Sequence, residues 1–442
     1  MGSGANACSI VCFEVSRARS SRWTRCGPTI GPYDDTGRTA PPNASVLPDP
    51  QGGPADEPPL DEAQQARLEE TEGYTRTVIY KGGEILYSIQ LPSGDVVDFI
   101  NRDTLPDLLY EPPKLELPQG VGVGLTELEQ LPELAELLAN AVPYLRPTFW
   151  EYILGDAPDA TSIEDYLARY QVGGHGDGTE GGQVSGVNRL YAGLDSPIPN
   201  RGVFGYMNQF RPKVAAGGFS LLELAVFCPI DNPVEMIGIV ISVDKKNKFG
   251  MNKQTLQDED PRLHVEYARS VNGEVRYRWD EIDGKFVANP FRVHHPGEKV
   301  PVSEVGGTQE EHLMAIVQSP DGGDWWIIYK GDVLGHYPAS LFTMLNGGAC
   351  GAAWYGEVLR DKKKDSSPET EMGSGQFPEA GMPNIAYVRY PMYYNLSWAP
   401  VEPLDDYHAQ PYEPLCYGRA PLADGILGMG GPGGFNPPCK WP

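Results

Sequence analysis

The sequence lacks long apolar runs and is poor in basic residues. No stretch reaches the eighteen or so apolar residues that a membrane-spanning helix needs. Its 60 Asp and Glu residues outnumber its 35 Lys and Arg residues, which gives a formal net charge of −25. Nucleic acids and anionic membrane surfaces attract basic proteins. We therefore expect neither nucleic acid nor membrane as a partner.

The sequence also lacks the spacing of metal ligands. No Cys or His pattern resembles a zinc site, and no ligand spacing is followed by His264, His294, His295, His312 and His336, which include one adjacent pair. We expect that pair on the surface, and we predict neither a metal nor a cofactor. The first 26 residues have a short apolar part with no basic segment before it, so they show no clear signal peptide.

What the sequence has in abundance is Gly (52) and Pro (42), which favour turn-rich β structure. Residues 1–60 mix Pro, Gly and acids and are expected to be disordered. Residues 61–171 predict a small α+β segment: a helix near 61–74, three short strands within 75–100, and helices within 124–142 and 162–171. A Gly-rich linker follows at 172–186.

Residues 187–442 predict strands almost throughout. "FSLLELAVF" (219–227) and "EMIGIVISVD" (235–244) are β-rich runs, and Asn272-Gly273 and Asp283-Gly284 are hairpin signals. Roughly a dozen strands with almost no helix indicate an all-β, antiparallel β-sandwich domain. Trp325 and Trp326 are adjacent, so in a strand they point to opposite faces.

One acid interrupts an apolar strand in this domain. "GAAWYGEVLR" (351–360) places Glu357 in the middle of an aromatic and β-branched run. A buried, unpaired carboxylate is expensive, so such a residue is normally exposed, paired or functional.

Four motifs in series resemble the catalytic domain of the neprosin family of glutamic peptidases. They are "DWWIIYKGDVLGHYPASLF" (324–342), "WYGEV" (354–358), "TEMGSGQFPEAG" (370–381) and "GGPGGFNPPC" (430–439). Upstream, "SGDVVDFINRDTLP" (93–106) is similar to the activation segment of the family. The resemblance implies a β-sandwich of the concanavalin-like, glutamic peptidase type, preceded by a pro-segment.

The resemblance also implies two catalytic glutamates that face each other across a sheet. The "WYGEV" motif assigns one to Glu357. The other family motif has Glu followed by small residues and Trp, and its place here is "NPVEMIGIVISVD", which assigns Glu235. This stretch departs from the pattern, because Met236 and Ile237 stand where small residues are expected and no Trp follows. Glu223 and Glu266 are the alternatives.

Two carboxyl groups in contact can hydrolyse a peptide without metal or covalent nucleophile. Like charges cannot both ionise, so one group keeps its proton and acts as the acid while its partner activates water. Such a pair works over an acidic pH window. Ser374, between glycines in "MGSGQFP", lacks the strand and helix of a hydrolase elbow, and we interpret it as a turn residue.

We therefore predict a secreted, monomeric endopeptidase that cleaves proline-containing peptides or proteins after proline, as the resemblance implies. The order of the parts predicts a latent proenzyme, in which residues 61–171 cover the sandwich. Asp95, Asp98 and Asp103 are candidates for pairing with basic groups there. The alternatives are a carbohydrate-active sandwich and an inactive binding module.

The four later cysteines of the seven, Cys228, Cys350, Cys416 and Cys439, are even in number and widely spaced, which allows two disulfides in an oxidising compartment. Buried free thiols in a cytosolic protein are the alternative. The family motif implies a disulfide between Cys416 and Cys439. Cys228 and Cys350 each lie seven residues before a proposed catalytic Glu. If the two glutamates face each other, these cysteines are also neighbours, and we predict a second bridge between them.

Overall fold

The structure is a computed structural model of the 442-residue chain. It describes strands at 11–14 and 24–27, and residues 60–433 apart from gaps at 109–110, 115–119, 121–122, 158, 170–187, 216–217, 229–233, 246–259, 272–273, 321–322, 361–369, 406–408 and 410–413. The first 57 residues form a unit separate from residues 58–442. That first unit contains a two-stranded antiparallel sheet, β1 (Val11–Glu14) and β2 (Thr24–Gly27).

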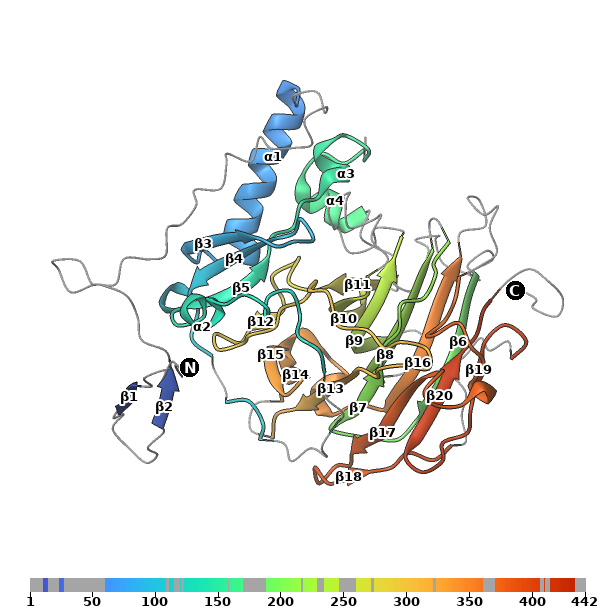
Figure 1. The fold of residues 1–442 in the computed structure, drawn as a ribbon. Helices are drawn as coiled ribbons and strands as arrows, with labels where there is room; N and C mark the ends of the chain where they lie inside the picture. Colours follow the sequence, from blue (N-terminus) through green and yellow to red (C-terminus); the bar gives the residue numbers. More distant parts are fainter. Residues whose placement is uncertain are drawn as a thin grey trace, which may run out of the picture. The chain divides into compact units, whose positions relative to one another are not determined.

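The N-terminal segment, as we call residues 61–169, combines helices with a small sheet (Figure 1). Asp61 caps α1 (Glu62–Tyr74) in a capping box with Gln64, which satisfies two backbone donors at its start. The other elements are the π-helical turn η1 (Thr75–Ile79), β3 (Ile85–Gln90), β4 (Val96–Asn101), η2 (Arg102–Thr104), α2 (Leu134–Leu137), β5 (Ala141–Leu145), α3 (Trp150–Ile153) and α4 (Ile163–Arg169).

Two secondary-structure predictions for this segment were wrong. The first strand expected within 75–100 is instead η1, which continues α1 and buries Ile79 and Tyr80. The helix expected over 124–142 shrinks to α2, because the chain from Ala141 pairs with β4 and completes the three-stranded sheet β3-β4-β5. Tertiary pairing overrides the local helical pattern here.

Two antiparallel sheets build the rest of the described structure. The six-stranded sheet has the order β11-β10-β9-β8-β16-β6. Its strands are β6 (Asn188–Ser196), β8 (Phe219–Cys228), β9 (Glu235–Asp244), β10 (Arg262–Val271), β11 (Glu274–Trp279) and β16 (Gly351–Arg360). Val271 lies opposite Glu274, so β10 and β11 form the hairpin predicted around Asn272-Gly273.

The nine-stranded sheet has the order β12-β15-β14-β13-β7-β17-β20-β19, with β18 paired to β17. Its strands are β7 (Gly202–Asn208), β12 (Val287–Ala288), β13 (Glu311–Gln318), β14 (Trp325–Tyr329), β15 (Asp332–Tyr337), β17 (Ala386–Tyr394), β18 (Pro400–Val401), β19 (Gly418–Arg419) and β20 (Ile426–Gly430). Short 3₁₀ turns connect them: η3 (Ala339–Leu341), η4 (Leu345–Gly347) and η5 (Pro378–Ala380).

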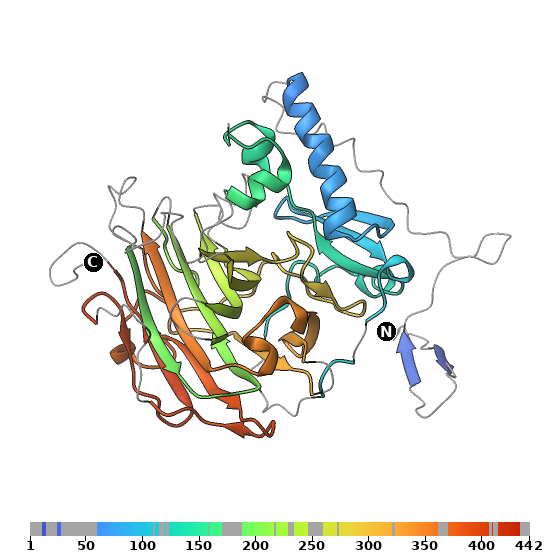
Figure 2. The same cartoon turned by 180° about the vertical axis from the view of Figure 1, so that it is seen from behind.

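The two sheets lie face to face around the main hydrophobic core (Figures 1 and 2). Ile237, Ile239 and Ile241 of β9 alternate into this core, as do Trp325 and Ile327 of β14. Every strand pair in both sheets is antiparallel. The predicted all-β sandwich is confirmed.

Some individual residues lie deeper than the sequence indicates. His294 and His295 were expected on the surface, but they are 4% and 0% exposed. Trp325 and Trp326 are both fully buried, with Trp325 donating to Leu345 O and the ring of Trp326 lying tilted against that of His336. Among the described residues, no helix combines the length and apolar character needed to span a bilayer.

A disulfide joins β8 to the start of β16. Cys228 and Cys350 are bonded with their Cα atoms 4.9 Å apart, which confirms the prediction. Their proximity follows from strand pairing, because Phe227 lies opposite Gly351 and its carbonyl accepts from Cys350 N. Cys416 is also disulfide-bonded, whereas its predicted partner at position 439 lies outside the described residues.

Replacing Cys228 and Cys350 together by Ala should destabilise the sandwich. The bridge closes a long loop, with a sequence separation of 122, and on the chain-entropy model its loss costs about 2–5 kcal/mol. Urea unfolding of the variant and the wild type would measure the difference. An unchanged free energy of unfolding, or free thiols at both positions in mass mapping without reductant, would contradict the prediction.

Candidate functional site

Glu357 lies in the middle of β16, between Leu221 of β8 and Tyr191 of β6. Its side chain is 0% exposed, and its Oε1 atom accepts from Nη1 of Arg189 at 2.5 Å. Arg189, on edge strand β6, is itself only 7% exposed in its side chain. The acid that interrupts the apolar strand is therefore a buried member of an ion pair, and Arg189 stabilises its ionised form.

Glu223 lies on the same face, one strand away. It sits on β8 opposite Tyr355 of β16, two residues before Glu357, and it is 0% exposed. Diagonal neighbours of this kind have Cα atoms about 7–8 Å apart, which long side chains can bridge. The register therefore brings Glu223 and Glu357 within reach of each other.

Glu266 of β10 completes a group of three buried glutamates. It lies opposite Gly238 of β9, and Gly238 lies opposite Ala225 of β8. A Cβ atom on Gly238 would lie 2.5 Å from Oε1 of Glu223, 2.9 Å from Cγ of Glu266 and 3.2 Å from its Oε1. The missing side chain lets two carboxyl groups from strands that are not adjacent meet over β9.

Tyrosines surround these carboxylates. Burial, followed by the charges of Glu223 and Glu357, raises the pKa of Tyr355 far above its ordinary value. Burial and Glu357 raise the pKa of Tyr191 despite the opposing charge of Arg189. Burial likewise raises the pKa of Tyr277, where Arg189 opposes and all three glutamates add. These phenols therefore stay protonated and can donate hydrogen bonds.

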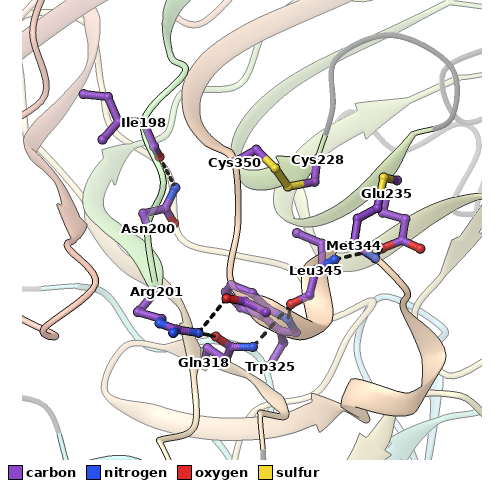
Figure 3. Close-up of a disulfide and its surroundings, with 11 residues drawn as sticks. Ile198, Asn200, Arg201, Cys228, Glu235, Gln318, Trp325, Met344, Leu345 and Cys350 are labelled. Carbon is purple, nitrogen blue, oxygen red and sulfur yellow. Dashed lines mark hydrogen bonds between the residues drawn. A yellow bond between two sulfur atoms is a disulfide. The ribbon is translucent and has the colours of Figure 1, made fainter.

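Glu235, assigned from the sequence, lies on the opposite face of the sheet. On β9 it shares the side of Ile237 and Ile239, which point into the main core, whereas Gly238 points to the other side. Its carboxylate accepts from the backbone N–H groups of Thr343, Met344 and Leu345 at 2.7, 2.7 and 2.9 Å. Figure 3 shows it next to the Cys228–Cys350 bridge, holding the turn before η4.

The structure thus does not bring Glu235 and Glu357 together. It places Glu223 and Glu266, the alternatives from the sequence, on the side of Glu357. Arg189 and the role of Gly238 were missed by sequence reasoning. One signal was available: "FSLLELAVF" places Glu223 in the middle of an apolar strand, as "GAAWYGEVLR" does for Glu357, whereas Glu235 stands at the very start of its strand.

The N-terminal segment packs against the glutamate face, as we call the face of the six-stranded sheet that carries Glu223, Glu266 and Glu357. A second buried apolar cluster joins sheet residues of this face with residues of the segment. The sheet contributes Phe219, Leu221, Ala225, Phe227, Met236, Val240, Ala268, Ala353, Tyr355 and Leu359, and the segment contributes Tyr74, Ile79, Tyr80, Ile100, Val142, Tyr144, Phe149, Tyr152, Ala157, Ala160, Ile163, Tyr166 and Leu167. Both faces of the sheet are therefore covered.

Ion pairs also join the segment to the sandwich, and the segment supplies the acid of each. Asp95 pairs with Arg262 of β10 at 2.7 Å, and Glu129 pairs with Lys330 at 2.7 Å. The other two acids expected to dock behave differently. Asp98 pairs with Arg146 within the segment at 2.5 Å, and Asp103 is exposed.

Residues 249–425 match the family model described as Neprosin. This part of the chain is similar to neprosin-family domains. The match includes β16 with Glu357 and β10 with Glu266, but it begins after Glu223 and Gly238. The match supports a peptidase, an enzyme whose substrates are peptides or proteins.

Several solved structures are distantly similar. Scytalido-glutamic peptidase with a transition state analog inhibitor matches at 7% identity and a TM-score of 0.29, over 55% of this chain and 98% of its own. SCP-B, a member of the eqolisin family of peptidases, matches at 8% identity and a TM-score of 0.26, over 56% and 99%. A GH16 protein of Bacteroides ovatus matches at 8% and 0.26, over 42% and 72%. Matches this distant assign no function.

Replacing Gly238 by Ala should disrupt the group of buried glutamates. The added methyl would overlap Glu223 and Glu266, and both must move although both are buried. A shift of about 1 Å at a reacting group lowers the rate on the order of 10²-fold. Peptidase assays after acid treatment would measure the loss. Gly347→Ala is the matched control, because nothing lies within 4 Å of its added Cβ, and equal activity of the two variants would contradict the prediction.

Proposed function

We propose that the chain is a glutamic endopeptidase whose catalytic pair is Glu357 and Glu223. The observation that carries the proposal is the burial of both carboxyl groups on one sheet face, with Arg189 on one of them and Glu266 near the other. Two carboxyl groups in such different surroundings are suited to different protonation states, which is what acid–base catalysis needs.

The surroundings of the two carboxyl groups support a division of roles between them. Arg189 favours the ionised form of Glu357, so Glu357 acts as the general base and takes a proton from the attacking water. Glu223 lies beside Glu266, and two neighbouring carboxyl groups away from water favour retaining a proton between them. Glu223 then acts as the general acid and gives its proton to the leaving amine nitrogen. The C–N bond breaks, and the water oxygen remains on the new carboxyl group.

Protonated tyrosines supply the third component. Negative charge develops on the carbonyl oxygen during attack, and hydrogen-bond donors fixed in a buried site stabilise it strongly. Tyr355 lies between the two catalytic residues in the register, opposite Glu223 and two residues before Glu357. Its phenol is therefore the donor that we assign to this oxygen.

The resemblance to the neprosin family supports three further features of the proposal. They are cleavage after proline, secretion and action at acidic pH. Two cysteines that are disulfide-bonded to each other, Cys228 and Cys350, also fit an oxidising compartment.

We further infer that the full-length chain is latent. Glu223, Glu266 and Glu357 are each 0% exposed, and the apolar cluster shared with the N-terminal segment lies over the same face. A substrate cannot reach carboxyl groups that have no accessible surface. Release of residues 61–171 would uncover this face.

Acidification weakens the docking of the segment. Burial favours the protonated form of Glu129, but the hydrogen bond from Lys330, with further help from Thr126 N and His294, lowers its pKa below the ordinary value of 4.5. A lowered pKa means that this contact stabilises docking above about pH 4.5 and is lost as the pH falls through the lowered value. Lys330 and protonated His294 then face a neutral group.

Glu357→Gln and Glu223→Gln should each abolish most activity while the fold persists. Removing a general acid or base lowers the rate about 10²–10⁴-fold, and the replacement is nearly isosteric. Glu235→Gln should keep its catalytic rate, because its carboxylate holds only the turn at Thr343–Leu345. Hydrolysis of proline-containing peptides between pH 3 and 7, with circular dichroism as the folding control, would measure all three.

Retained activity in Glu223→Gln with loss in Glu266→Gln would move the acid role to Glu266. Full activity in Glu357→Gln would end the proposal. Parallel assays on polysaccharides test the carbohydrate-active alternative. Hydrolysis of a polysaccharide without cleavage of any peptide would favour that alternative over the peptidase. An inactive binding module would hydrolyse neither.

Incubation of the full-length chain at pH 3–4 should produce a shorter, active form. The expected new N-terminus lies in residues 170–190, and Glu357→Gln should stay intact under the same conditions. Because Glu129→Gln removes a docking charge, its activation should begin at a higher pH than that of the wild type. Mass spectrometry and peptidase assays along a pH series would follow both changes.

Asp103 offers the matched control for Glu129, since it is an acid of the same segment whose side chain is exposed. Asp103→Asn should activate at the wild-type pH. Full activity of the uncut chain at neutral pH would rule out latency, and equal activation curves for Glu129→Gln and the wild type would rule out the role of this ion pair.

A further inference from the structure

Arg262 holds a carboxylate of the N-terminal segment on the glutamate face. Its Nη2 atom lies 2.7 Å from Oδ2 of Asp95, and both side chains are only 5% exposed. The Asp95 carboxylate also accepts from Ser93 Oγ at 2.8 Å. On the other side, Nη1 of Arg262 donates to Gly297 O at 2.7 Å. Nη1 therefore holds the guanidinium to the sandwich, while Nη2 binds the segment.

Arg262 lies in the same row of the sheet as Glu357. Arg262 of β10 pairs with Ser242 of β9, Ser242 pairs with Leu221 of β8, and Leu221 pairs with Glu357 of β16. Paired residues share a face in an antiparallel sheet, so Arg262 is on the glutamate face. Three strand spacings separate the two residues, or about 14 Å.

This separation fits an extended peptide. At about 3.4 Å per residue, 14 Å corresponds to about four residues. A substrate lying across the strands with its scissile bond at Glu357 and Glu223 would place a side chain about four residues away beside Arg262. When the N-terminal segment leaves, the same guanidinium loses the Asp95 carboxylate but keeps its anchor at Gly297.

We propose that Arg262 forms an anion subsite of the substrate-binding face, and that Asp95 occupies it in the full-length chain as a substitute for a substrate carboxylate. This inference rests on the proposed peptidase function. The subsite takes an acidic side chain or a C-terminal carboxylate of the peptide. Arginine remains charged at every working pH, and a desolvated guanidinium binds carboxylates in a directed, charge-assisted hydrogen bond.

The first test uses the full-length chain and needs no activity. Asp95→Ala, made together with Glu357→Gln to prevent self-cleavage, leaves room for a small carboxylate beside Arg262. Acetate at pH 6 should raise the Tm of this variant relative to chloride at equal ionic strength, and adding Arg262→Met should remove the acetate effect. Asp103→Ala in the same background is the control and should respond equally to the two salts.

The second test uses acid-activated protein and matched peptides. In two pairs of peptides, Asp or Asn stands four residues before or four residues after the proline cleavage site. In a third pair, the peptide ends four residues from that site in a free or an amidated C-terminus. At pH 5 most Asp side chains are ionised, so the wild type should show a KM about 10-fold lower for Asp than for Asn on one side. Arg262→Met should lose this difference, and Arg262→Lys should keep part of it.

The outcomes separate the two proposals. Acetate stabilisation that depends on Arg262 supports the anion subsite even if no variant cleaves peptides, in which case the peptidase proposal fails by itself. Peptide cleavage with the same KM for charged and neutral peptides on both sides overturns the subsite and leaves Arg262 as a docking residue only. Equal Tm values in acetate and chloride for the Asp95→Ala chain would overturn it as well.

Discussion

Three glutamate carboxyl groups share one buried sheet face, and keeping them there constrains much of the surrounding structure. An ionised carboxylate away from water is costly unless a cation or hydrogen-bond donors compensate it. Arg189 does so for Glu357 from the edge strand β6. Gly238 gives Glu223 and Glu266 the space to meet, and the tyrosines around them remain protonated donors. Replacing Arg189 would remove the cation that compensates the buried Glu357 carboxylate.

Strand register decides which acids can belong to this group. Side chains alternate between the two faces of a strand, so a displacement of one residue moves a carboxylate from one face to the other. Glu235 and Gly238 are three residues apart on β9 and therefore point in opposite directions. On its own face Glu235 accepts three backbone hydrogen bonds and organises a turn. The same residue type thus serves structure on one side of the sheet and the proposed chemistry on the other.

Much of the fold could be predicted from the sequence, because apolar runs and hairpin signals mark β8, β9, β10 and β11 directly. The second glutamate could not be fixed in this way, because assigning it needs the register between strands that are distant in sequence. The motif match placed it at Glu235, three residues before Gly238. The rule that singled out Glu357, an acid in the middle of an apolar strand, applies equally to Glu223. His294 and His295 show a second limit. They are polar residues but are buried, because the local sequence does not reveal which other elements pack over a residue.

The packing of the N-terminal segment also explains why β8 is apolar on both faces. A sandwich strand with one solvated face alternates apolar and polar residues, whereas every residue of β8 is buried. Its second face is satisfied by the N-terminal segment, which shares an apolar cluster with it. In the proposed latent enzyme this face loses the segment on activation and then offers its apolar and charged groups to another chain. An extended peptide can replace the segment at the same positions, with its backbone near Glu357 and a carboxylate at Arg262. In the proposed latent enzyme the segment and the substrate are alternative occupants of one face, and acidification favours the exchange because Glu129 helps to dock the segment as a carboxylate.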